Sequence, residues 1–446
     1  MTSRREPRET IDRWLAHFRS LEAVGLAGDW LAPVRRAAID SFASRGFPTT
    51  KDEDWKYTNV EPVVRVPWTP VFASTPNGVP ARAVERLGLG LAGTRLVFVN
   101  GHLGRALSSV VPRPGANVGS LAEAMLRDER ALVAAHLARH ARPDRTAFAA
   151  LNAAFTLDGA LVHVPDGSEY EDPIQLLFLS SSREADTVSH PRVLVALGRS
   201  SRATLVETYG ATGPGASLTN TVVEIVLGDG AALDHVKLVE GGRAAAHVAL
   251  TEVVQGRDSR YRSWSLALGA SFARNDLCVL LDGEGAACTL DGLYLASDEE
   301  LVDNHTRIDH AKPRGTSREL YKGILDGRSR AVFNGKVIVR PGAQQTDAQQ
   351  TNKNLLLSER AEVDTKPELQ IRADDVKCSH GAAIGQLDPE AVFYCKSRGM
   401  DETTARRTLT WGFASDVVRR IPMAPLRDAI DTRLAERLAP EHGGTR

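Results

Sequence analysis

The sequence predicts a mainly β fold, in which a solenoid of stacked coils lies between helical N-terminal and C-terminal parts. Three observations support this prediction. Short β-branched or alternating runs fill the chain from about residue 160 to about residue 387. Turn-like segments separate these runs at a recurring spacing. Helical patterns occur only before and after this stretch, so we divide the chain into residues 1–145, 146–388 and 389–446.

Residues 1–145 are expected to be mostly helical. Four apolar side chains near the start share one face of a helix: Ile11, Trp14, Leu15 and Phe18. A second helix is expected across Leu31–Phe42. Arg95–Val99, followed by Asn100-Gly101, predicts a strand and a turn. Helical character returns from Leu121 to His140.

In the middle part, a turn is followed by a small or basic residue and then by a strand. These turns begin at Gly198, Gly228, Gly256, Gly283, Gly327 and Ser358. The steps between them are 30, 28, 27, 44 and 31 residues, as in a solenoid, whose coils bury short strands only against neighbouring coils. The 44-residue step is expected to carry an inserted loop or an extra coil. A β-sandwich is the alternative, but it predicts strands about every 8–12 residues without a longer repeat.

Three helices are expected in residues 389–446. Asp388 and Pro389 fit the N-cap and first position of a helix that ends at Gly399. Asp401 can cap the next helix, whose apolar side chains repeat every four residues: Ala405, Leu409, Phe413, Val417 and Ile421. The third helix repeats in the same way: Leu426, Ile430, Leu434 and Leu438. So small a tail cannot bury both stripes alone. One stripe is expected to dock on the solenoid and the exposed remainder on a partner protein; the equally favoured alternative is that the helices serve only as a cap of the solenoid.

Composition argues against several classes of protein. The 446 residues include 55 basic and 56 acidic side chains, for a formal charge of −1, which gives no electrostatic case for nucleic acid or a membrane surface as a partner. No apolar run is long enough to span a bilayer, and the first residues fit neither a secretory signal nor a transit peptide, so a cytoplasmic protein is expected. Four cysteines without a CxxC pair predict reduced thiols.

Motifs of familiar enzymes are absent from the sequence. There is no GxxxxGK[ST], no GxSxG, no HExxH and no GxGxxG that opens a helix. His305 and His310 have Asp303 and Asp309 beside them, which allows a metal or acid–base site. Residues five apart in a strand point to opposite faces, however, so loop or solvated histidines are favoured.

The most suggestive local group is Cys378 and His380, in the segment Lys377–Gly381. In an extended strand these two side chains share a face, about 6.5–7 Å apart. A thiolate and an imidazole can both bind iron or an iron–sulfur species. Two ligands do not complete a site, so a partner would have to supply the rest. The alternative is an inert buried cysteine beside a hydrogen-bonded histidine.

Two segments closely resemble the core signature of the SufB/SufD family of iron–sulfur cluster assembly scaffolds. The first is Gly335–Ala348, continuing to Asn352–Ser358, and the second is Lys377–Ala382 with Phe393–Gly399. The resemblance covers nearly the whole chain, weakly in residues 1–45 and 60–145. Three shorter segments are more similar to the SufD branch than to the SufB branch: Lys51–Thr58, Phe98–Gly101 and Cys378–Gly381.

The resemblance implies a non-catalytic scaffold subunit with a right-handed parallel β-helix between helical ends. It implies pairing with SufB through the β-helix, docking of the SufC ATPase through helices 401–438, and support of iron acquisition and cluster assembly at the SufB–SufD interface. The family's interface cysteine and histidine fall on Cys378 and His380. These would hold transient iron or a nascent cluster shared with SufB, and the isolated chain would bind none stably. The sequence does not decide whether the isolated chain forms a homodimer or whether it binds a flavin. Three cysteines match no family site: Cys278, Cys288 and Cys395.

Two other functions fit parts of the pattern. A β-helix enzyme that acts on polysaccharides would need clustered carboxylates with Lys or Arg in an open groove. Asp374-Asp375 is the only adjacent pair near the candidate site, and the missing export signal argues against this function. A SufB-like scaffold that pairs with itself and holds a cluster alone is disfavoured, because the chain has no local set of cysteines.

Overall fold

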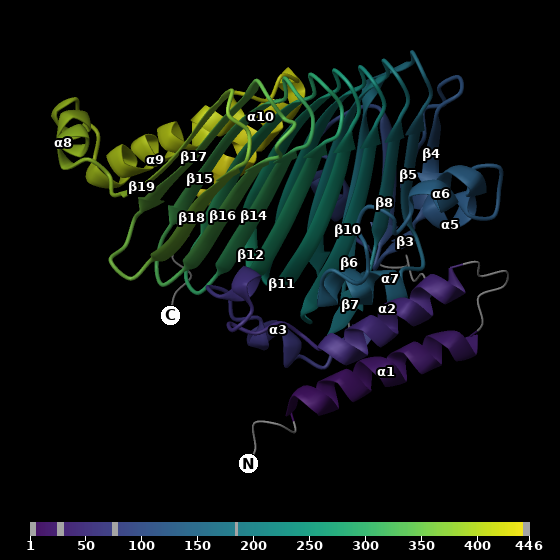
Figure 1. Cartoon of the computed structure of the whole chain (residues 1–446). Coiled ribbons are helices and arrows are strands. Elements are labelled where there is room, and N and C mark those ends of the chain that lie inside the picture. Colours follow the sequence, from purple (N-terminus) through teal and green to yellow (C-terminus); the bar gives the residue numbers. More distant parts are fainter. Residues whose placement is uncertain (1–5, 25–30, 74–78, 183–185, 440–446) are drawn as a thin grey trace.

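Two ladders of parallel strands form the centre of the protein (Figure 1). The computed structural model describes residues 6–24, 31–73, 79–182 and 186–439. Helices near both ends of the chain lie against the outside of the ladders. The predicted class, mainly β with a solenoid core and helical ends, is confirmed. The exact domain boundaries stay predictions.

The N-terminal part is an array of helices with a few short strands. Its elements are α1 (Glu6–Val24), α2 (Ala32–Arg45), η1 (Glu53–Trp55), α3 (Glu61–Val64), β1 (Thr69–Pro70), α4 (Ala81–Leu87), β2 (Thr94–Val99), β3 (His102–Leu103), η2 (Arg105–Leu107), β4 (Asn117–Ser120), α5 (Leu121–Ala124), α6 (Arg130–His136) and α7 (Ala147–Phe155). The predicted strand and turn are confirmed, since β2 and β3 form an antiparallel pair around Asn100-Gly101. The helical stretch expected from Leu121 to His140 is two short helices, and Ala138 has a positive φ of 60° that a helix cannot continue through.

Each coil of the solenoid contributes one strand to each ladder, and the coil-to-coil pairings are parallel. Ladder A consists of β2, β6 (Glu169–Ser181), β9 (Arg202–Thr212), the first halves of β11 (Ala232–Gln255) and β12 (Arg260–Leu281), β13 (Ala287–Ala296), β15 (Thr316–Leu325), β17 (Thr346–Leu356) and β19 (Val376–Gly385). Ladder B consists of β5 (Gly159–Val164), β8 (Arg192–Leu197), β10 (Ser217–Leu227), the second halves of β11 and β12, β14 (Leu301–His310), β16 (Arg330–Val339) and β18 (Glu362–Ile371). A short strand, β7 (Thr187–Ser189), links β1 to β10.

The 44-residue step contains neither an inserted loop nor a single added coil. Each coil has two corners, and the series of turns moves from one corner to the other. Gly283 precedes β13 of ladder A, whereas Gly327 precedes β16 of ladder B. In the next coil, the corner that stacks on Gly283–Gly285 contains Pro313. The Pro313 carbonyl oxygen accepts a hydrogen bond from the Gly285 amide. The step therefore spans about one and a half coils.

Not every strand is as short as the solenoid prediction required. The strands β11 and β12 run continuously through both ladders over 24 and 22 residues. Their corner residues remain paired with each other, with register shifts between Val239 and Ala246. The corner bends the ladder there instead of interrupting it, and Gly241-Gly242 of β11 and Gly269 of β12 lie at this bend.

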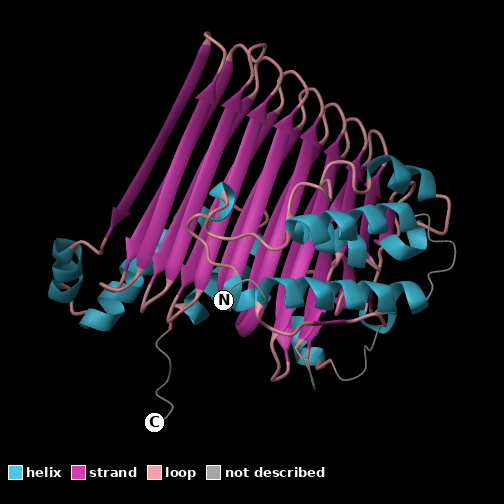
Figure 2. Cartoon of the chain, turned by 60° about the horizontal axis from the view of Figure 1, so that its bottom comes forward, coloured by secondary structure: helices cyan, strands magenta, loops and turns pink. Residues whose placement is uncertain are grey.

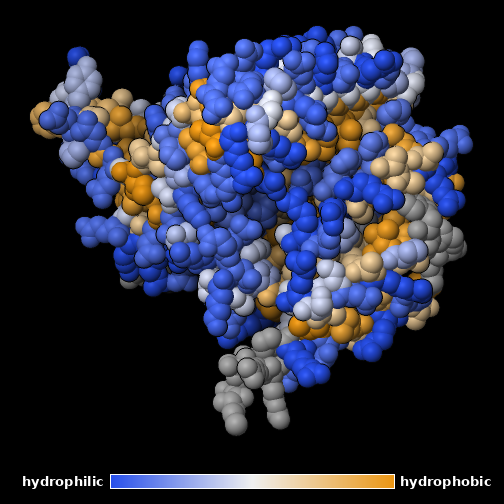
Figure 3. Space-filling view, viewed as in Figure 1, coloured by the Kyte–Doolittle hydropathy of each residue, from blue (hydrophilic) through white to orange (hydrophobic). Residues whose placement is uncertain are grey.

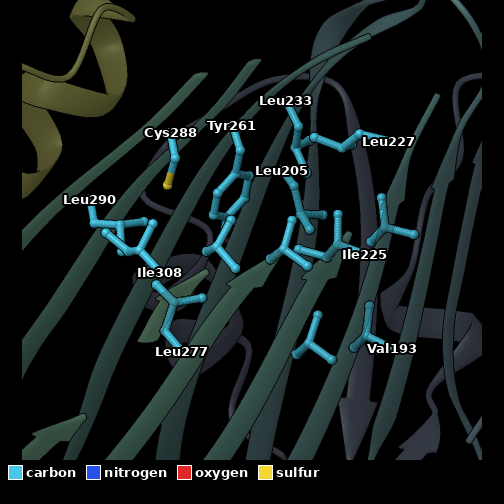
Figure 4. Close-up of a cluster of buried hydrophobic side chains, with 14 of the residues drawn as sticks. Val193, Leu205, Ile225, Leu227, Leu233, Tyr261, Leu277, Cys288, Leu290 and Ile308 are labelled. Atoms are coloured by element: carbon cyan, nitrogen blue, oxygen red, sulfur yellow. The ribbon is translucent and has the colours of Figure 1, made fainter. Parts of the chain in front are cut away.

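The core lies between the two ladders. Inward side chains from successive coils pack on one another, as Figure 4 shows for Leu205, Ile225, Tyr261 and Leu277. Each fully buried aliphatic side chain of this kind contributes about 1.5–3 kcal/mol to stability. Cys288 belongs to this core, and its burial raises the pKa of its thiol well above the ordinary value.

The N-terminal helices cover the outer face of ladder B (Figure 2). One segment fastens them to the strands. Trp55 stacks on the Arg274 guanidinium, with 4.1 Å from the guanidinium carbon to the ring centroid. Arg274 also donates to Asp303 at 2.6 Å, and the Thr58 hydroxyl donates to the same carboxylate at 2.6 Å. This network explains why Trp55 and Thr58 are buried in an otherwise polar segment.

The C-terminal helices are α8 (Pro389–Ser397), α9 (Glu402–Val418) and α10 (Ala424–Arg437). The predicted N-caps are confirmed: the Asp388 side chain accepts from the Glu390 amide, and Asp401 accepts from Thr404. The α9 and α10 helices lie along the outer face of ladder A, and Ile430 is completely buried there. Both stripes therefore dock on the side of the solenoid, and the expectation that one stripe stays exposed for a partner is wrong. Within the described ranges, no helix has the length and apolar character needed to cross a membrane.

Candidate metal-binding site at the open end of the solenoid

The two ladders end in unpaired strand edges. Of the described strands, β18 pairs only with β16, and β19 pairs only with β17. Figure 1 shows these two strands at the far end of the array from α5 and α6. At the other end, β3 pairs with β2 and β4 pairs with β5. The edges of β18 and β19 thus offer free backbone donors and acceptors to a strand of another chain.

Cys378 and His380 lie on β19, in the last coil. Their Cα partners on β17 are Ala348 and Gln350, so both side chains belong to the inward row of ladder A. Cys378 is half-buried against the core, whereas His380 is exposed. The strand places a thiol and an imidazole in one row at the open end, as expected from their spacing. Their role as metal ligands stays a prediction. Across the described parts of the chain, no three His, Cys, Asp or Glu side chains gather closely enough to hold a metal ion.

The environment of Cys378 favours the neutral thiol. Burial raises the pKa of the Cys378 thiol, and the carboxylate of Asp347 acts in the same direction, while a hydrogen bond with the Ala348 backbone opposes them. A thiol of this kind becomes a thiolate when a cation displaces its proton. Binding of a cation to this thiol would therefore release a proton.

His305 and His310 do not form a second site. Both lie on β14 and point to opposite faces, as the spacing predicted. The expectation of loop or solvated histidines is wrong. His310 is completely buried between the ladders, where its Nε2 lies 2.9 Å from the Ser317 hydroxyl, and burial lowers its pKa to about 4. His305 lies under the N-terminal segment, 3.0 Å from Asp303. Neighbouring coils and helices decide this burial, and the local sequence does not record them.

The other three cysteines are far from the last coil or on a different element. Cys278 faces outward from ladder B, into a cavity of about 620 Å³ beneath the N-terminal segment. Cys288 is in the core, and Cys395 lies on α8. All four thiols are free, as predicted.

Two buried polar residues next to the candidate site were not predicted from the sequence. Glu319 on β15 and Gln350 on β17 are 4% and 1% exposed. Gln350 donates from Nε2 to Glu319 at 2.6 Å. Burial raises the pKa of Glu319 to about 7, while the Thr306 hydroxyl and Gln350 oppose this rise. The only sequence signal was that Gln350 falls inside the family-like stretch around residues 335–358.

Exposed apolar side chains gather on the projecting helix α8. Phe393 is 73% exposed and Tyr394 is 59% exposed. Figure 3 shows apolar surface on this projection, which Figure 1 labels α8. None of the α8 residues is buried. Exposed apolar surface of this kind is typical of contact sites between proteins.

Comparisons with known proteins agree with the resemblance seen in the sequence. A family model described as "SUF system FeS cluster assembly, SufBD core domain" matches residues 178–413, and one described as "SufBD protein N-terminal region" matches residues 22–176. The chain is 34% identical over 427 residues to an iron–sulfur cluster assembly SufBD family protein of Synechocystis, covering 94% of this chain and 93% of the relative. It is 31% identical over 420 residues to the iron–sulfur cluster assembly protein SufD of Escherichia coli, covering 93% and 94%. It is 29% identical over 286 residues to SufD of Bacillus subtilis, covering 63% and 64%.

Proposed function

Because the chain belongs to the SufB/SufD family of iron–sulfur cluster assembly proteins, we propose that it is a non-catalytic, SufD-like scaffold subunit of a cytoplasmic SUF complex. In this role it pairs with SufB, docks the SufC ATPase, and supports iron acquisition and de novo cluster assembly where the two scaffold chains meet. The observation that carries the proposal is the position of Cys378 and His380 in a last coil with free strand edges.

Pairing with SufB uses the edges of β18 and β19. Each is a strand of ten residues whose outer edge can take a strand from the partner, which extends both ladders. The half-buried side chains of Val363, Leu369 and Val376 would then be covered by the next coil. In the absence of SufB, the same edges can pair two copies of this chain.

Cys378 and His380 supply a thiolate and an imidazole to iron or to a nascent cluster that is cargo of the complex. Two ligands from this chain leave the remaining coordination positions to SufB. Because the pKa of the Cys378 thiol is raised, a metal ion must compete with the thiol proton, which lowers the metal affinity of this residue. We therefore expect the isolated chain to hold no metal stably.

Docking of SufC uses the C-terminal helices of residues 401–438. The inner faces of α9 and α10 are packed on ladder A, so the outer faces of these helices are the parts that remain accessible. The exposed side chains of Phe393 and Tyr394 on α8 extend this surface. Apolar side chains of this size are typical anchors of protein interfaces.

Replacement of the two candidate ligands tests the proposed chemistry. We expect Cys378→Ala and His380→Ala to lower cluster formation by the reconstituted three-protein complex at least about tenfold, since each removes a ligand. Ser379→Ala is the matched control, because Ser379 lies between them on the opposite face of β19 and is exposed. Cluster formation would be followed by iron and sulfide analysis. Unchanged assembly in both ligand variants would refute the proposal.

Loss of SufC binding tests the docking surface. A chain that ends at Gly399 is expected not to retain SufC in co-purification. Because this truncation uncovers the outer face of ladder A, a point variant is also needed. Phe393→Asp is expected to weaken SufC binding, whereas Val24→Asp, which alters an equally exposed side chain on α1, is expected to leave it unchanged. Retention of SufC by a folded truncated chain would exclude docking through residues 401–438.

A further inference from the structure

We propose that Gln350 is a positioning residue that accepts a hydrogen bond from one ring nitrogen of His380, and that Glu319 holds Gln350 in the orientation this requires. The inference deepens the proposed function, since it rests on His380 as an iron ligand. It assigns a role to two buried polar side chains that are otherwise unexplained in an apolar core.

The three residues are stacked in consecutive coils. Glu319 on β15 is the Cα partner of Gln350 on β17, and Gln350 is the Cα partner of His380 on β19. Neighbouring strands are about 4.8 Å apart, so side chains at paired positions of a parallel ladder lie directly beside one another. Glu319, Gln350 and His380 therefore form one row, which runs from the buried interior to the last coil.

The amide of Gln350 has one partner and one unsatisfied atom. Its Nε2 donates to Glu319 Oε2 at 2.6 Å, which directs the nitrogen toward the coil below. Its Oε1 is buried and has no hydrogen-bond partner among the described residues. In a planar amide the oxygen and the nitrogen diverge from the same carbon, so with the nitrogen directed to Glu319 the oxygen is free to face the coil that carries His380. An unpaired buried carbonyl oxygen is unfavourable, so an N–H donor from His380 would complete this group.

The opposite ladder prevents the amide from turning away. Gly335 on β16 faces Gln350 across the core, and a Cβ atom at this position would lie only 2.1 Å from Gln350 Nε2 and 2.8 Å from Phe333 Cζ. The missing side chain of Gly335 thus provides the space that the Gln350 amide occupies. The Thr306 hydroxyl faces Glu319 from the same ladder. Gln350 therefore has Glu319 on one side and Gly335 with Phe333 across the core, and β19 lies on the remaining side of its strand.

The exposed ring of His380 is able to complete the row. Its side chain can rotate toward Gln350, and a partner strand on β19 would exclude water from this position. A ring nitrogen that donates to Gln350 carries the proton, which leaves the lone pair of the other nitrogen free for a metal ion. Supporting hydrogen bonds of this kind fix the ring of a ligating histidine and change metal affinity by roughly 10–100-fold.

Cobalt binding to the complex of this chain with SufB tests the inference. Co²⁺ is the probe, and its absorption bands report coordination by thiolate and imidazole. We expect Gln350→Met and Glu319→Met to weaken Co²⁺ binding roughly 10–100-fold and to alter the bands. Glu319→Gln is expected to bind like the native chain, because its amide oxygen still accepts from Gln350. Gln349→Met is the matched control, since Gln349 is the adjacent, exposed residue of β17.

The outcomes separate this inference from the function on which it rests. If His380→Ala weakens Co²⁺ binding but Gln350→Met leaves affinity and bands unchanged, the positioning role is refuted and the ligand role stands. If His380→Ala has no effect, the proposed function itself fails. Thermal unfolding and co-elution with SufB show that each variant is folded. If Gln350→Met does not fold, equal Co²⁺ affinities of Glu319→Met and Glu319→Gln would overturn the inference.

Discussion

Replacement of Glu319 by glutamine is expected to change how the stability of the protein depends on pH. In the native chain, burial raises the pKa of Glu319 from 4.5 to about 7. Between these values the folded protein holds a proton that the unfolded chain has released. The free energy of unfolding therefore falls as the pH rises through this range.

The structure sets the magnitude of this effect. Each pKa unit corresponds to about 1.36 kcal/mol, so the rise from 4.5 to about 7 removes about 3 kcal/mol of stability in total, most of it between about pH 5 and about pH 7.5. A glutamine at this position does not titrate and can still accept from Gln350. The variant should thus match the native protein in acid and exceed it by about 3 kcal/mol at about pH 8.

Urea unfolding of both proteins across this pH range measures the difference. Other buried acids titrate in the same interval, including Glu252, whose pKa is raised to about 7, but they are present in both proteins and cancel. Glu359→Gln is the control, because Glu359 is an exposed corner residue. If the native protein and Glu319→Gln lose stability in parallel from acid to neutral pH, Glu319 is not protonated in the folded state and the reasoning is wrong.

Three further predictions concern packing and buried charge. Ile430→Ala should lower the free energy of unfolding by about 2–5 kcal/mol, because this side chain is completely buried between α10 and ladder A; a smaller loss in urea unfolding would mean that α10 is loosely attached. Glu224→Gln should raise hydrogen exchange at Ala138, His140 and Ala141, whose amides donate to the Glu224 carboxylate at 2.8–3.0 Å, and unchanged protection would contradict this. Gly335→Ala should destabilise by about 1–3 kcal/mol, and Gln350→Ala should relieve most of this loss in a double-mutant cycle; additive losses would show that the two residues do not compete for space.

The solenoid could be predicted because its corners are local signals. Glycine-containing turns about every 30 residues mark the coils without knowledge of any long-range contact. The same signals could not show which of the two corners a turn occupies, and for this reason the step from Gly283 to Gly327 was misinterpreted. Helix caps are equally local, and both Asp388 and Asp401 were predicted correctly.

Some residues of the candidate site could be predicted from the sequence, and their buried neighbours could not. Cys378 and His380 were found because they are two residues apart on one strand. Glu319 and Gln350 were missed because their relation to His380 depends on the register between coils. That register is set by corners of different length, and a change of one residue would turn the whole row to the other face. The exposure of α8 was unpredictable for a similar reason, since it depends on where the solenoid ends.

The difference between the two ends of the solenoid limits what the protein can build. The first coil is finished by β3 and β4, whereas the last coil offers both of its edges. Among the described strands only this end is open, and a chain with one open end can form a closed pair but cannot add a third chain through the same edges. A solenoid of parallel strands can in this way present unpaired edges at one end without extending into a filament through them.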